Sequence, residues 1–250
     1  MSNLTTRILT GVVFATVLIG CISWNKWSTA ILFLFFSTVG TIEFYKILKK
    51  NNLSNNSNYG PIVNVVIYTL MTLAFIDVIY FEYLFLGIPF LIILVLMELY
   101  SKDEIPYQNI SSTLFGLFYI TLPFSALNYL SFNEMVYDKI ELSTNWSLLA
   151  GYFIILWTSD SMAYVVGRLI GKHKLFERIS PGKTWEGFFG GVVFSILAGF
   201  LFAYFTNSSK EHWMIMAIII SVFGTLGDLS ESLLKRSGDV KDSGTILSDD

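Results

Sequence analysis

Long apolar blocks, separated by short polar segments, follow one another along almost the whole chain. A helix needs roughly 20 apolar residues to cross the hydrocarbon core of a membrane, and most of the blocks approach that length. Hydropathy places them at residues 8–24, 27–47, 62–79, 83–100, 110–131, 147–168, 188–206 and 213–228. The pattern predicts an all-α, polytopic transmembrane helix bundle with about eight spans.

The boundary between the third and fourth blocks is the least distinct. Apolar character runs almost continuously from Val63 to Met97, interrupted only by Asp77, Glu82 and the Gly-Ile-Pro sequence at 87–89. Because Gly and Pro are tolerated in membrane helices, this last sequence need not be a loop.

Composition agrees with a membrane protein. Hydrophobic residues make up 54% of the chain and charged residues 14%, against about 25% charged residues in soluble domains. The mean hydropathy is +0.61. Cys21 is the one cysteine, so neither a disulfide nor a cysteine-based metal site can form within the chain.

The distribution of Lys and Arg predicts an orientation. With a cytoplasmic N-terminus, thirteen of these residues fall in cytoplasmic segments, and three, Lys26, Lys139 and Lys210, fall outside. Cytoplasmic loops of membrane proteins are enriched in basic residues, so we expect that orientation. Within one integral membrane domain, we expect N-terminal transmembrane helices at 1–140 and a C-terminal catalytic region at 141–250. A bacterial inner membrane is the expected location.

The cytoplasmic segment at 159–187 contains the sequence Pro-Gly-Lys-Thr, which superficially matches a nucleotide-binding P-loop. A P-loop requires Gly where this chain has Glu177, so that hypothesis is rejected. Ser180, Lys183, Thr184 and backbone N–H groups at a helix start can still bind phosphate oxygens. Alternatively, the basic residues of this segment only contact anionic lipid.

Acidic residues inside predicted spans are the next candidates. Burying an Asp at the centre of a span costs roughly 2.5 to 3.5 kcal/mol, so such residues normally pair, line a polar cavity or bind a cation. Asp160 lies well inside its span, where a functional role competes with a helix-packing hydrogen bond. Asp77 and Glu98 lie near span ends, where we expect exposure to water.

A third cluster follows the last apolar block. Asp228, Glu231 and Ser232 share one face if the helix continues, and Lys235 and Arg236 follow within two turns. Carboxylates beside basic residues suit a magnesium ion that itself holds phosphates. The alternative is a salt bridge of Asp228 or Glu231 with Lys235.

These residues resemble a known family. The pattern SxLLKRxxxxKDSG is present as Ser232, Lys235, Arg236, Lys241, Asp242 and Gly244, and it resembles the signature of the phosphatidate cytidylyltransferases, also called CDP-diacylglycerol synthases. SPGKTWEGFFGG at 180–191 and SDSMAYVVGRLIGKHKL at 159–175 are similar to two further blocks of that family. The resemblance covers most of the chain from about residue 150 onward.

The resemblance implies an integral membrane enzyme that uses CTP, phosphatidate and Mg²⁺ and releases CDP-diacylglycerol and pyrophosphate. The implied catalytic residues are Asp228, Lys235, Arg236, Lys241 and Asp242. The implied substrate-binding residues are Ser180, Lys183, Thr184, Asp160 and Ser232. Asp228 matches a metal ligand of the family, and Glu231 joins it as a candidate ligand because of its spacing.

The chain departs from the family pattern near its end. The family signature continues with Pro or Gly, any residue, His-Gly-Gly and later an Asp-Arg-x-Asp segment, whereas Ser248 and Asp250 stand at the Pro/Gly and His positions of this chain. We therefore expect the chain as written to bind substrate weakly and to turn over poorly.

The sequence is also compatible with other functions. A transporter should show inverted halves and broken helices, whereas the polar blocks here lie in the second half of the chain. A CTP-dependent lipid kinase of the polyprenol type would release CDP instead of pyrophosphate, and an inert scaffold would tolerate loss of Asp228. We expect contact with membrane lipids and no nucleic-acid partner; a homodimer is compatible with the sequence, which does not determine the oligomeric state.

Overall fold

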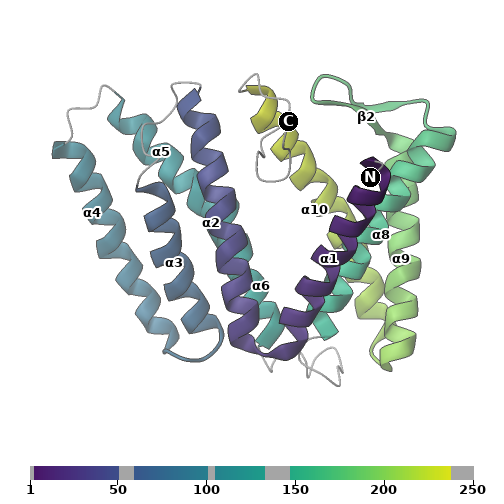
Figure 1. The fold of residues 1–250 in the computed structure, drawn as a ribbon, viewed down its shortest axis with the longest axis horizontal. Helices are drawn as coiled ribbons and strands as arrows, with labels where there is room; N and C mark the ends of the chain where they lie inside the picture. The colour runs from purple at the N-terminus through teal and green to yellow at the C-terminus, as the bar shows by residue number, and fades with distance from the viewer. Residues whose placement is uncertain (1–2, 51–58, 101–104, 133–146, 238–250) are drawn as a thin grey trace. The chain divides into compact units, whose positions relative to one another are not determined.

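The computed structural model of the protein, shown as a ribbon in Figure 1, describes residues 3–50, 59–100, 105–132 and 147–237. Within these residues the chain is almost entirely helical. It divides into two compact units, the first built from α1 to α6 and the second from α8 to α10. The predicted helical, polytopic fold class is confirmed.

The first unit contains the helices of the first five predicted spans. Its elements are α1 (Asn3–Trp24), α2 (Lys26–Lys50), α3 (Gly60–Phe75), the 3-10 turn η1 (Phe81–Leu86), α4 (Gly87–Tyr100), α5 (Pro106–Gly116), the π-helical turn η2 (Leu117–Thr121) and α6 (Leu122–Phe132). Turn η1 leads directly into α4, so the Gly-Ile-Pro sequence is helical. This agrees with the tolerance of membrane helices for Gly and Pro. Helix α3 ends at Phe75, and the chain turns at Asp77, whose φ is 57°.

Buried polar side chains connect the helices of the first unit. Asn64 of α3 accepts hydrogen bonds from the hydroxyl groups of Ser37 (2.7 Å) and Thr121 (2.6 Å). Asn128 of α6 donates to the hydroxyl oxygen of Tyr68 at 2.9 Å. Such bonds between helices hold membrane bundles together, because lipid offers polar groups no other partner.

One expectation for this unit is wrong. Glu98 is only 6% exposed, although its position near a span end predicted contact with water. Its carboxylate accepts a hydrogen bond from the amide of Asn109 at 3.2 Å. The partner lies on α5, and such a contact between helices cannot be deduced from the position of Glu98 within its own helix.

The described residues of the second unit form three helices and a hairpin. Its elements are α8 (Ser147–Ile170), β1 (Lys174–Phe176), β2 (Ser180–Thr184), α9 (Trp185–Thr206) and α10 (Lys210–Ser237). The two strands pair in antiparallel fashion, and Lys174 is opposite Thr184. Hydropathy did not predict this hairpin, because its strands have only three and five residues and no apolar alternation.

Helix α9 packs closely against its two neighbours through small residues. Buried small residues recur at every fourth position of α9: Gly187, Gly191, Ser195, Gly199 and Ala203. A Cβ atom added at Gly191 would lie 2.9 Å from the carbonyl oxygen of Ser159 on α8. One added at Gly199 would lie 2.8 Å from the carbonyl oxygen of Trp213 on α10. Small residues permit this close approach of helix backbones in membranes.

Six helical segments of the described chain are long and apolar enough to cross a membrane, and two shorter apolar helices, Leu9–Trp24 and Gly60–Phe75, accompany them. The chain is therefore an integral membrane protein. The count of eight spans and the cytoplasmic N-terminus stay predictions.

Candidate active site

The hairpin and the C-terminal end of α10 lie at the same end of the second unit (Figure 1). There the ammonium group of Lys183, on β2, forms an ion pair with the carboxylate of Asp228, on α10. The Asp228 side chain is 54% exposed, so the pair is open to solvent on one side. Two motifs that are far apart in the sequence thus meet at one place.

The start of α9 determines where Lys183 lies. Thr184 precedes the first residue of α9, and its hydroxyl oxygen accepts a hydrogen bond from the N–H of Gly187 at 3.2 Å. This is an N-cap, which satisfies a backbone donor that the first turn of a helix leaves free. The predicted helix start is confirmed. Thr184 itself is buried, and its predicted contact with substrate stays a prediction.

Glycine residues let the hairpin approach the end of α8. A Cβ atom added at Gly171 would lie 2.2 Å from the carbonyl oxygen of Gly167 and 2.7 Å from the hydroxyl oxygen of Thr184. Real side chains essentially never tolerate such distances. The position after α8 therefore requires glycine, and the hairpin base packs directly on that helix end.

Glu186, in the first turn of α9, was not among the predicted site residues. Its carboxylate accepts hydrogen bonds from the backbone N–H groups of Lys172 (3.1 Å) and His173 (3.2 Å), and it lies 2.6 Å from Nδ1 of His173. The sequence offers no signal for these contacts, because two of the three donors belong to the backbone.

Asp160 extends the charged cluster. It lies on α8, is exposed, and interacts electrostatically with both Asp228 and Lys183. Its neighbour Ser159 forms the helix-packing hydrogen bond at this level, to the hydroxyl group of Ser221 at 2.6 Å. The side chain of Asp160 makes no hydrogen bond with a described residue, so Ser159, and not Asp160, supplies the helix-packing hydrogen bond at this level.

Helix α10 continues through Ser237, so Asp228, Glu231 and Ser232 share a helix face, as the spacing predicted. Glu231 forms an ion pair with Lys235, one turn later, at 2.6 Å. The predicted alternative of a salt bridge therefore holds for Glu231, whereas Asp228 pairs with Lys183.

The remaining predicted residues are placed as follows. Ser180 is half-buried at the first position of β2. Ser232 is half-buried and Arg236 is exposed, and the side chain of neither makes a hydrogen bond or ion pair with another residue that the structure describes. Lys241 and Asp242 lie outside the described residues.

The carboxylates of this site can supply part of the ligand set of a hard cation such as magnesium. Among the described residues, no group of three or more His, Cys, Asp or Glu side chains is arranged to hold a metal ion. Asp160 and Asp228 nevertheless interact with each other. Magnesium in nucleotide sites is commonly bound by one or two carboxylates, and substrate phosphates and water complete its coordination. Two carboxylates suit that pattern.

Comparison with protein families matches residues 5–249 to the family described as the cytidylyltransferase family. Three similar proteins from staphylococci are each named phosphatidate cytidylyltransferase. The Staphylococcus epidermidis protein is 38% identical over 149 residues, which is 59% of this chain and 53% of the relative. The Staphylococcus haemolyticus protein is 47% identical over 97 residues, which is 38% of this chain and 37% of the relative.

The Staphylococcus aureus protein is 36% identical over 149 residues, which is 59% of this chain and 53% of the relative. The chain spans about half the length of the curated relatives it matches.

Proposed function

Because the chain belongs to the cytidylyltransferase family, we propose that it transfers the cytidylyl group of CTP to phosphatidate, forming CDP-diacylglycerol and pyrophosphate. The names of its staphylococcal relatives support this proposal. The observation on which it rests most is the ion pair of Lys183 and Asp228, which joins two of the motif blocks at one end of the second unit.

The two substrates explain why this site needs basic side chains. CTP and phosphatidate are both anionic, and they repel each other when they approach. Lys183 from the hairpin and Lys235 and Arg236 from α10 supply positive charge at the same end of the unit. Ammonium and guanidinium groups form strong, charge-assisted hydrogen bonds with phosphate oxygens.

The reaction itself is an in-line displacement at phosphorus. A phosphate oxygen of phosphatidate forms a bond to the α-phosphorus of CTP, and the bond from that phosphorus to the bridging oxygen of the β-phosphate breaks. The bonding electrons leave with pyrophosphate. Lys183 and Lys235 stabilise the negative charge that grows on this leaving group. No covalent intermediate with the protein is required.

The ion pairs of the structure give these lysines a resting position. Lys183 is held by Asp228 and Lys235 by Glu231; both carboxylates are exposed to solvent and both lysine side chains are half-buried. Pairs of this kind are weak, typically about 0 to 1 kcal/mol, so phosphate oxygens can replace the carboxylates. Binding of a triphosphate would then free Asp228 and Glu231.

Magnesium is the proposed cofactor, and Asp228 with Asp160 or Glu231 would hold it. When bound, it neutralises charge on the triphosphate and on the departing pyrophosphate. The carboxylates orient that charge relative to Lys183, and Ser180 and Ser232 offer hydroxyl donors for phosphate oxygens.

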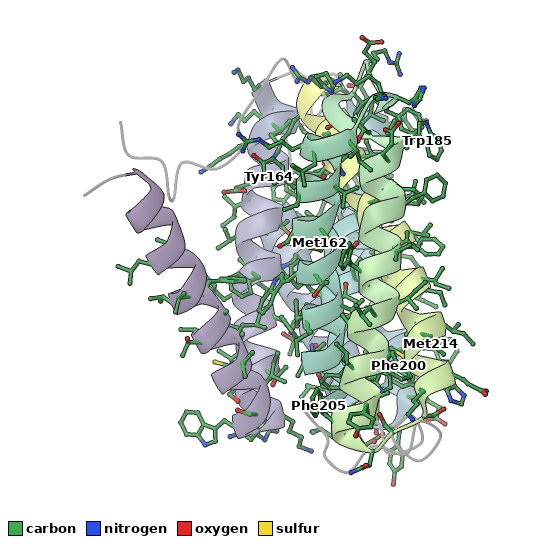
Figure 2. The ribbon with its side chains drawn as sticks, turned by 90° about the vertical axis from the view of Figure 1, so that its right-hand side faces the viewer. Met162, Tyr164, Trp185, Phe200, Phe205 and Met214 are labelled. Carbon is green, nitrogen blue, oxygen red and sulfur yellow. The ribbon has the colours of Figure 1, made fainter. Side chains whose placement is uncertain are left out.

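We place the catalytic region in the second unit, at the cytoplasmic face of a bacterial inner membrane. The basic residues of the hairpin support this side of the membrane. Figure 2 shows Trp185 at the start of α9, directly after the hairpin, and this residue is 44% exposed. Tryptophan is enriched where a membrane meets water, so its position supports a site at the level of lipid headgroups.

The direct test is an assay of the purified full-length protein in detergent with phosphatidate and CTP labelled in the α-phosphate. The label is expected in CDP-diacylglycerol, with pyrophosphate as the second product. Label recovered in CDP, with a phosphorylated lipid beside it, would instead identify a lipid kinase and contradict the proposal.

A further inference from the structure

We infer that Glu186 is a positioning residue for this reaction: it fastens the entry end of the β1–β2 hairpin so that Lys183 is presented to the substrate phosphates. The inference rests on the proposed function of the site. It concerns a residue that does not itself belong to the ion pairs at the reaction centre.

The two ends of the hairpin are held in different ways. At the exit end, β2 runs directly into α9, and the Thr184 cap makes that junction part of the helix. At the entry end, the connection is less direct, because residues 171–173 separate the last residue of α8, Ile170, from the first residue of β1. The backbone N–H of Trp185 donates to the carbonyl oxygen of His173 at 2.9 Å, which is one link across the base.

Glu186 supplies the other links across that base. One carboxylate binds two consecutive backbone N–H groups, those of Lys172 and His173, and the imidazole of His173. A carboxylate that accepts several hydrogen bonds at once is bound much more firmly than a single neutral acceptor. Since the carboxylate belongs to the first turn of α9, it fixes the entry end to the same rigid helix as the exit end.

Lys183 is three residues from Glu186 and lies on the strand whose partner begins at Lys174. If the entry end moves, the pairing of Lys174 with Thr184 moves with it, and the ammonium group of Lys183 loses its fixed position. A displacement of about 1 Å in a catalytic group can lower a rate by about 100-fold. Glu186 therefore influences the rate through Lys183.

The hairpin provides a matched control. Glu177 is an exposed glutamate located between the two strands, and its side chain makes no hydrogen bond or ion pair with any residue that the structure describes. Glu177→Gln removes one carboxylate charge close to Lys183 in the sequence without touching the base of the hairpin. Cytidylyl transfer by this variant is expected to stay within about twofold of the unchanged protein.

The test is a double-mutant cycle in the full-length protein, with kcat and KM measured for CTP. Lys183→Gln is expected to lower kcat about 100-fold, and Glu186→Gln about 10-fold with KM nearly unchanged. In the Lys183→Gln background, Glu186→Gln should add less than about a twofold loss, because the residue through which it acts is gone. Glu186→Asp, which keeps the carboxylate, should recover activity to within about threefold.

Hydrogen exchange of the backbone amides gives a readout that does not depend on activity. Glu186→Gln should accelerate exchange in residues 172–184 and leave residues 210–230 unchanged, and Glu177→Gln should change neither region. If Glu186→Gln does not fold, Glu186→Asp takes its place in the cycle, with about a threefold loss when Lys183 is present and none when it is absent.

A loss from Glu186→Gln of the same size in both backgrounds would overturn the inference and leave the proposed function intact. Unchanged exchange in residues 172–184 would also overturn it. Failure of the unchanged protein to form CDP-diacylglycerol would instead contradict the proposed function.

Discussion

The two units use polar side chains in opposite ways, and the contrast is clearest in two carboxylates. Glu98, in the first unit, is 6% exposed and accepts a hydrogen bond from a neutral amide. Asp228, in the second unit, has a side chain that is 54% exposed and pairs with a lysine. Both lie in apolar helices, yet of these two only Asp228 lies in a solvent-exposed cluster of opposite charges.

The same contrast extends to the neutral polar residues. In the first unit, Asn64 and Asn128 are fully buried and connect helices through hydrogen bonds. In the second unit, small residues on α9 and one buried hydrogen bond between Ser159 and Ser221 bring the helices together, and the charged groups gather at one end. Polar residues in the first unit therefore stabilise packing, whereas those at the end of the second unit are available for chemistry.

The largest expected effect is on the charged cluster. Asp228→Asn keeps the shape of the side chain but removes its charge, so it should lower kcat for cytidylyl transfer by about 100-fold or more. Its thermal unfolding midpoint in detergent should change little, because exposed ion pairs contribute little to stability. Glu211→Gln, in the first turn of the same helix, is the control and should leave activity unchanged. Full activity of Asp228→Asn would contradict a role of the charged cluster of the second unit in the reaction.

A smaller but clear effect is expected at the close contact of α8 and α9. Gly191→Leu places a branched side chain where even a Cβ atom lies 2.9 Å from a carbonyl oxygen. Overpacking of this kind typically costs about 1 to 3 kcal/mol, so the unfolding midpoint should fall measurably. In Gly182→Ala, an added Cβ meets no described atom within 4 Å, and stability should be preserved. Equal stability of both variants would contradict close packing by small residues.

The smallest effect is expected in the first unit. Asn64→Leu removes the acceptor of two buried hydroxyl groups, those of Ser37 and Thr121. Interhelical hydrogen bonds in membrane proteins average about 0.6 kcal/mol, so a loss of about 1 kcal/mol of unfolding free energy is expected, with kcat per folded molecule unchanged. Thr69→Val is the control, since the hydrogen bond that its hydroxyl group makes in the described part of the chain goes to Val65 of the same helix. A selective loss of kcat in Asn64→Leu would contradict the assignment of packing to the polar residues of the first unit and of chemistry to those of the second.

Much of the fold could be predicted because long apolar blocks identify membrane helices in a sequence. The continuation of α10 past Asp228 was also predictable, since the spacing of Asp228, Glu231 and Lys235 is helical. The hairpin was not, because its strands are short and lack alternation. The burial of Glu98 was missed because its partner, Asn109, belongs to another helix.

The site shows the same limit. Lys183 and Asp228 were each candidates from residue type and motif, but only folding brings the two together. The spacing allowed Lys235 to pair with either Asp228 or Glu231, and the structure contains the pair of Lys235 with Glu231. Glu186 was missed because it binds backbone N–H groups, which every residue except proline has and which therefore leave no mark in a sequence.

The most direct measurement of the central claim is zero-length cross-linking of the unchanged protein with a carbodiimide, followed by peptide mass spectrometry. This reagent joins an ammonium group to a carboxylate only when the two are in contact, as Lys183 and Asp228 are. We predict an amide bond between Lys183 and Asp228 whose yield falls when CTP and magnesium are added. Cross-links from Lys183 only to carboxylates of its own hairpin, such as Glu177, with none to Asp228, would contradict the account.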